Sequence, residues 1–193
     1  MSTGKSVNSK RPTLAEGRRL ITEFDQQYDE IESAIQSLCD QFPRHDQFTD
    51  VLLKVSTINQ LYSTNIYDVA GVARHITNTQ VGSRIADGDL SVVADIANVK
   101  LGGKAKRFLS FASKYCSWHC PEKYCIYDSY VDEALWVFKR DFSFAQFTRA
   151  DLRDYGRFME LVGDFSVFFG LSELSLKDLD KYLWLLSRGM KAG

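Results

Sequence analysis

Asp128 is the residue with the clearest chemical potential, because it lies between Tyr127 and Ser129 at the expected start of a helix. A carboxylate at this position can cap the helix by accepting hydrogen bonds from its first N–H groups. It can also stabilise positive charge on a substrate or activate a water molecule. The two roles are compatible, because a cap also holds the carboxyl group in a fixed place.

A basic segment precedes this acid. Residues 98–123 carry six lysines and arginines and one acid, in a chain whose net charge is only -1. Gly102 and Gly103 separate two helical patterns, which predicts a tight turn that leads into a basic, serine-lined helix over residues 104–117. Free N–H groups at a helix start and nearby lysines bind phosphate, whereas the alternative is an ordinary solvated helix face. The candidate phosphate-binding residues are Lys100, Gly102, Gly103, Lys106, Arg107 and Lys114.

Four possible metal ligands follow in the same region, namely Cys116, His119, Cys120 and Cys125. Thiolates and imidazoles bind zinc, but this spacing matches no standard structural zinc site. Cys116 also lies on the apolar side of its helix, where free cysteine is common. We therefore expect free cysteines and no bound metal.

The rest of the chain predicts the helices that position these residues. Apolar residues recur at helical spacing, which favours an all-α fold with one domain over residues 13–193, after a disordered tail over residues 1–12. Thr13, Asn65 and Asp89 are the expected caps of the first, third and fourth helices. Helices are expected over residues 13–42, 46–62, 66–76, 90–97, 104–117, 128–139, 148–170 and 176–189.

The composition also limits the class of protein. The chain is 45% hydrophobic, so it can bury a core, and no stretch approaches the roughly 18 consecutive apolar residues of a membrane span. No signal peptide is visible. These observations predict a soluble, cytoplasmic protein without a membrane partner, and we expect a monomer.

Two stretches resemble the helix-hairpin-helix DNA glycosylase superfamily, and most closely its 8-oxoguanine-glycosylase-like branch. The first, LGGKAKRFLSFAS, has Ala105 and Ala112 where the family has two alanines in the helix after its glycine-rich hairpin. The second, IYDSYVDEAL, contains Asp128 where the family has its catalytic aspartate. The terminal LKDLDKYLW is similar to the closing helix of the family.

The resemblance implies a helical bundle of two small lobes that binds duplex DNA, flips out a damaged base and cleaves its N-glycosidic bond without a cofactor. Asp128 would stabilise the sugar cation. The Schiff-base lysine of bifunctional members falls at Gly103, so Lys104, one residue away, is the candidate nucleophile, with a phosphate contact or solvent exposure as alternatives. The resemblance provides no firm basis for lyase activity.

Residues that could contact a flipped base are aromatic or polar and lie near the expected pocket. The alternative to an enzyme is a non-catalytic helical module that binds DNA or a protein, with a role in stress or phage defence. The base-pocket candidates are Tyr62, Asn65, Trp118 and Tyr127.

Overall fold

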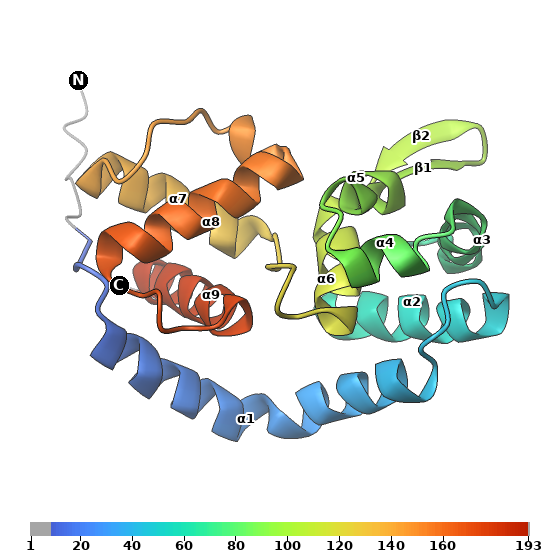
Figure 1. Ribbon diagram of the computed structural model, residues 1–193, viewed down its shortest axis with the longest axis horizontal. Helices are drawn as coiled ribbons and strands as arrows, with labels where there is room; N and C mark the ends of the chain where they lie inside the picture. Colours follow the sequence, from blue (N-terminus) through green and yellow to red (C-terminus); the bar gives the residue numbers. More distant parts are fainter. Residues whose placement is uncertain (1–8, 193) are drawn as a thin grey trace.

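The computed structural model describes residues 9–192, with side chains up to Met190. The fold is mainly α-helical, as expected. The long helix α1 (Leu14–Gln41) runs along two groups of helices (Figure 1). The first group contains α2 (Phe48–Tyr62), α3 (Val69–Thr79), α4 (Gly82–Asp87), α5 (Ser91–Ala97) and α6 (Leu109–His119). The second contains α7 (Ser129–Phe142), α8 (Tyr155–Phe169) and α9 (Leu176–Ala192), with a 3-10 turn, η1 (Asp151–Arg153), before α8.

Several helices begin at caps that the sequence predicts. Thr13 accepts a hydrogen bond from the N–H of Glu16 at the start of α1, and Ser175 accepts one from Asp178 at the start of α9. The expected cap Asn65 is wrong. Asn65 has a positive φ of 60°, and α3 is capped three residues later by Asp68, which accepts from the N–H of Gly71. A short polar side chain that bonds its own backbone explains each of these starts.

The expected turn between helices at Gly102 and Gly103 is also wrong. An antiparallel ribbon forms there from β1 (Asn98–Leu101) and β2 (Lys104–Arg107), with Leu101 opposite Lys104. Both glycines have positive φ, 52° and 78°, which a two-residue hairpin turn requires and which glycine adopts without strain. Figure 1 shows the ribbon projecting from the first group of helices.

As a result, the basic helix expected over residues 104–117 begins only at Leu109. Its supposed solvated face is wrong as well, because Ser113, Lys114 and Ser117 are all buried. The helix lies between α1, α2 and α5, so it has no broad face open to solvent. The basic residues of the segment are therefore divided between an exposed ribbon and a buried helix.

Residues 9–12 are placed by contacts, unlike the tail expected over residues 1–12. The N–H and hydroxyl of Ser9 donate to Asp141, and Arg11 donates to the carbonyl of Phe168. Residues 1–8 lie outside the described residues. Within residues 9–192, no helix is long and apolar enough to cross a membrane.

The core continues through both groups of helices. Val55, Ile58 and Phe111 are buried in the first group, while Phe138 and Phe165 pack with ring centroids 5.4 Å apart in the second. Residues 120–128 connect the groups, and Figure 1 shows this segment passing between them. Asp128 lies at the end of this segment, where the two groups of helices meet.

Candidate functional site

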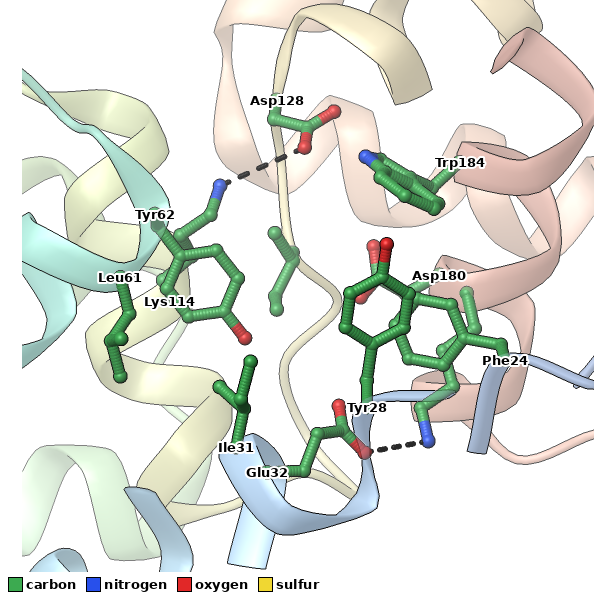
Figure 2. Close-up of a pocket in the computed structure, with 12 residues that line it drawn as sticks. Phe24, Tyr28, Ile31, Glu32, Leu61, Tyr62, Lys114, Asp128, Asp180 and Trp184 are labelled. Carbon is green, nitrogen blue, oxygen red and sulfur yellow. Dashed lines mark ion pairs between the residues drawn. The ribbon is translucent and has the colours of Figure 1, made fainter. Parts of the chain in front are cut away.

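A cavity of about 210 Å³ opens where α1, α2, α6 and α9 meet the segment leading into α7 (Figure 2). Its lining combines aromatic rings with acids and lysines from elements far apart in the sequence. The lining residues are Phe24, Tyr28, Ile31, Glu32, Leu61, Tyr62, Lys114, Ile126, Asp128, Asp180, Lys181 and Trp184.

Asp128 is both the cap of α7 and part of this cavity. Its Oδ1 accepts hydrogen bonds from the N–H groups of Tyr130 and Val131, at 2.9 and 3.0 Å. Its Oδ2 lies 3.8 Å from Nζ of Lys114, and the side chain is 18% exposed. One oxygen thus fixes the carboxyl group to the positive end of the helix dipole, while the other faces the cavity.

Lys114 is the basic residue of the cavity closest to this acid. Its side chain is only 3% exposed, its Nζ donates to Oγ of Ser110 at 2.9 Å, and it lies 5.2 Å from the ring centre of Tyr62. Burial lowers the pKa of Lys114, and Asp128 opposes that shift. An amine with a lowered pKa is the form of lysine that can act as a nucleophile.

Asp180 supplies a second carboxyl group from α9. Only 9% of the residue is exposed, and no other side chain or backbone group of residues 9–192 donates a hydrogen bond to its carboxyl group. Burial raises the pKa of Asp180 well above its usual range, and the nearby Asp128 raises it further. Figure 2 draws Asp128, Lys114 and Asp180 around one space.

Aromatic rings form the walls. Phe24 and Tyr28 of α1 lie 4.6 Å apart, and the ring of Trp184 from α9 meets both edge-on, at 5.6 and 6.3 Å. Tyr62 lies on the other side of the cavity in Figure 2, and its hydroxyl accepts from the indole N–H of Trp118 at 3.2 Å. Such walls suit a flat, apolar-faced ligand.

Ion pairs between α1 and α9 close one edge of the cavity. Lys181 contacts Asp25 at 2.6 Å and Glu32 at 2.8 Å, and Lys177 lies 3.7 Å from Glu32. Nζ of Lys177 also sits 3.6 Å from the ring centre of Trp118. Lys177 and Lys181 of α9 thus contact α1, and Lys177 also contacts the ring of Trp118.

The structure brings three of the candidate residues together and separates the others. Asp128, Lys114 and Tyr62 line the cavity. Lys114 was a candidate phosphate contact, and the structure places it in this cavity instead. Trp118 does not line the cavity, but its indole N–H donates to the hydroxyl of Tyr62. Asn65 is exposed in the loop after α2.

Tyr127 does not line the cavity, because its hydroxyl donates to Asp132 at 3.0 Å and its ring packs edge-on against Phe158. Lys104 is exposed on β2 and is likewise absent from the cavity lining. The candidate nucleophile in this geometry is therefore Lys114 and not Lys104. Lys100, Gly102, Gly103 and Lys106 are exposed on the ribbon, and Arg107 donates to the carbonyl of Arg153.

The residues of the possible zinc site do not form one. Cys116 and Cys125 are fully buried, the four cysteines are free, and His119 packs against the ring of His45 at 4.4 Å. Among residues 9–192, no group of three histidines, cysteines or acids could hold a metal ion.

Sequence reasoning missed the contribution of α1 and α9 to the site. The usable signal was Asp180, which occupies an apolar position of its helix between Leu176, Leu179 and Leu183. An acid in such a stripe indicates a buried charge or a functional group. Trp184 lies one helical turn further on the same face.

Comparisons with known proteins place the chain in a family. The family model described as "HI_0787_N: N-terminal domain" matches residues 16–123, which include α1 to α6. An uncharacterized protein of Haemophilus influenzae is 42% identical over 139 residues, which are 72% of this chain and 66% of that protein. The chain thus spans just under two thirds of the length of this relative. No solved structure matches the chain. Because the family model covers more than half of the residues, the chain belongs to the HI_0787_N family.

Proposed function

We propose that the protein is a DNA glycosylase that flips a modified base into the cavity and cleaves its N-glycosidic bond, with the ribbon of β1 and β2 in the place of a helix-hairpin-helix turn. The observation that carries the proposal is the position of Asp128, whose Oδ2 faces Lys114 in a cavity with aromatic walls. At about 210 Å³ the cavity is smaller than the roughly 300 Å³ at which sites for drug-sized ligands begin, so it suits one ring system.

Asp128 has the geometry that this reaction requires. Cleavage of an N-glycosidic bond builds positive charge on the sugar, which a fixed carboxylate stabilises without reorganisation. The N–H groups of Tyr130 and Val131 hold Oδ1 in place, so Oδ2 keeps its direction toward the substrate. The aromatic walls favour an extruded base by stacking on its faces.

Lys114 adds a covalent route. Its neutral amine would form a bond from Nζ to C1′ of the sugar, while the C1′–N bond breaks and its electron pair leaves with the base, which takes up a proton from water. The ammonium group formed at Nζ then passes a proton to Asp128. Asp128 returns this proton to the ring oxygen O4′ as the C1′–O4′ bond breaks, which gives an iminium ion between Nζ and C1′. Burial lowers the pKa of Lys114 and so favours the neutral amine that this step needs.

The ribbon supports DNA binding outside the cavity. Lys100, Lys104 and Lys106 are exposed on its two strands, and the glycine tip leaves the backbone open. A two-stranded ribbon fits the major groove of duplex DNA, and lysines neutralise its phosphates. Leu101 packs against Gly71, and Arg107 bonds to Arg153, which anchors the base of the ribbon.

The test uses duplexes that each carry one uracil, hypoxanthine, 8-oxoguanine or alkylated base. The protein is incubated with each duplex, and alkali then converts any abasic site into a strand break. The wild type is expected to break at least one duplex, and Asp128→Asn is expected to lose that activity. Salt-sensitive binding without breakage of any duplex would instead support the non-catalytic DNA-binding module.

A further inference from the structure

Asp180 is an anomaly that the proposed cleavage reaction does not use. Buried polar groups are almost always hydrogen-bonded, and an unpartnered buried carboxyl group calls for an explanation. Asp180 is 9% exposed and lines the cavity, and no described residue forms a hydrogen bond or a close ion pair with its carboxyl group. Among the described residues, the fully buried polar atoms without a partner are Nε2 of His119 and Oγ of Ser187, so the Asp180 oxygens are reached from the cavity. Because Asp180 lines the cavity, a ligand bound there could be its hydrogen-bond partner.

The charged neighbours of Asp180 already form hydrogen bonds or ion pairs with other residues. Lys114 of α6 bonds to Ser110 and faces Asp128, which begins α7. Lys177, on the same helix as Asp180, pairs with Glu32 of α1. Burial raises the pKa of Asp180, and the negative charges of Asp128 and Glu32 raise it further, while Lys114 and Lys177 oppose the shift, so the balance favours the neutral carboxyl group. The groups that face it electrostatically are Asp128, Lys114, Lys177 and Glu32.

A protonated carboxyl group offers one donor and one acceptor side by side. That pair matches the edge of a heteroaromatic ring with an N–H next to a carbonyl oxygen or a ring nitrogen. Trp184 lies one turn along the same helix, and Phe24 and Tyr28 stand beside it, so a flat ring at Asp180 would lie against aromatic faces.

We infer that Asp180 is the residue of the cavity that recognises a nucleobase, binding its lactam or amidine edge as a neutral acid through one donated and one accepted hydrogen bond. The inference rests on the proposed function for the identity of the ligand as a nucleobase. Asp180 of α9 would then select the base, whereas Asp128 and Lys114 would act on the sugar. A base methylated on this edge cannot make both hydrogen bonds.

Two substitutions at Asp180 separate a neutral acid from a charged one. Asp180→Asn keeps one donor and one acceptor in nearly the same shape, whereas Asp180→Leu keeps only the size. The probes are adenine and uracil methylated at the nitrogen that carries the sugar in DNA (9-methyladenine and 1-methyluracil), so that only the pairing edges remain. N6,N6,9-trimethyladenine and 1,3-dimethyluracil are their matched blocked forms. Binding of each probe to the full chain is measured by ligand-observed NMR titration, and circular dichroism checks that each variant is folded.

We expect 9-methyladenine or 1-methyluracil to bind the wild type and Asp180→Asn with affinities within about threefold of each other, because both proteins present the same pair of hydrogen-bonding groups. Asp180→Leu and the blocked probes are expected to lose roughly tenfold or more. Binding to the wild type should also weaken as the pH rises through the raised pKa of Asp180, while binding to Asp180→Asn should not change in this range.

Equal binding to the wild type and Asp180→Leu would overturn the inference. A loss in Asp180→Asn as large as that in Asp180→Leu would overturn it as well, since it would indicate that the charged form binds. Failure of both 9-methyladenine and 1-methyluracil to bind the wild type would also count against it. These probes need neither DNA nor bond cleavage, so retained base binding without any strand break would contradict the glycosylase proposal alone.

Discussion

Nζ of Lys114 lies 3.8 Å from Oδ2 of Asp128 inside the cavity, although Lys114 comes from the middle of α6 and Asp128 from the start of α7. The lysine is almost fully buried and the acid is held by two backbone N–H groups. The proposed covalent cleavage at a sugar carbon would need a nucleophile and a carboxylate in such contact. The predictions below separate this chemistry from a purely structural ion pair.

Asp128→Asn should distinguish the helix-capping role of Asp128 from its proposed catalytic role. Asparagine caps helices about as well as aspartate, so the free energy of unfolding should change little, whereas loss of the carboxylate should slow base release by roughly a hundredfold or more. Asp128→Ala removes the cap too and should destabilise the protein by about 1 kcal/mol. Chemical denaturation and single-turnover base release measure the two effects.

Equal activity of Asp128→Asn and wild type would contradict a catalytic role for this residue. Equal losses of stability in Asp128→Asn and Asp128→Ala would show that asparagine does not replace the cap, and the activity of Asp128→Asn could then not be assigned to chemistry.

Asp180 should make stability depend on pH. Because its pKa is raised in the folded protein, the folded state holds a proton that the unfolded state releases above the ordinary pKa of an aspartate. Stability should therefore fall as the pH rises from the ordinary pKa through the raised one. Asp180→Asn should lack this contribution and be more stable than the wild type at neutral and higher pH.

Urea denaturation of both proteins at pH 5, 7 and 9 checks this point. Asp178→Asn is the matched control, because Asp178 is an acid on the same helix that lies outside the cavity and bonds to Ser175. Parallel stability curves for the wild type and Asp180→Asn would mean that Asp180 does not bind its proton more tightly in the folded protein.

The ribbon lysines should set the salt dependence of DNA binding. Replacing Lys100, Lys104 and Lys106 by glutamine should lower the slope of log affinity against log salt by about 0.9 for each lysine that contacts a phosphate. Lys10→Gln is the control, since this exposed lysine pairs with Glu16 at the start of α1. Fluorescence anisotropy over a salt series gives the slopes. An unchanged slope in the triple variant would exclude the ribbon as the DNA contact.

The helix starts could be predicted because their signals are local. Thr13, Asp128 and Ser175 are each followed by an apolar pattern, and each accepts a hydrogen bond from the first turn of its helix. The ribbon is harder to predict, because the Gly102–Gly103 pair between two helical patterns also indicates a break between helices. A Gly-Gly pair between short segments is equally a hairpin signal, and their positive φ values explain why the strands form.

The candidate site could be predicted only in part. Asp128 and Tyr62 were expected at the site, since both carry groups suited to a base or a sugar. Lys114 was a candidate phosphate contact, with a solvated helix face as the alternative, and its burial could not be predicted because it depends on α1 and α2 packing over α6. The acid at an apolar position of α9 marks Asp180 as unusual, but the packing of α9 against α1 and α7, which brings Asp180 and Trp184 to the cavity, is contained in no local pattern.

The most direct measurement is the mapping of a borohydride-trapped adduct. The protein is mixed with a duplex that contains one abasic site, sodium borohydride reduces any iminium ion, and peptide mass spectrometry locates the modified lysine. The account predicts one adduct at Lys114, which Lys114→Met abolishes and Lys104→Met retains. An adduct at Lys104, or the absence of any adduct with a protein that binds the duplex, would contradict it.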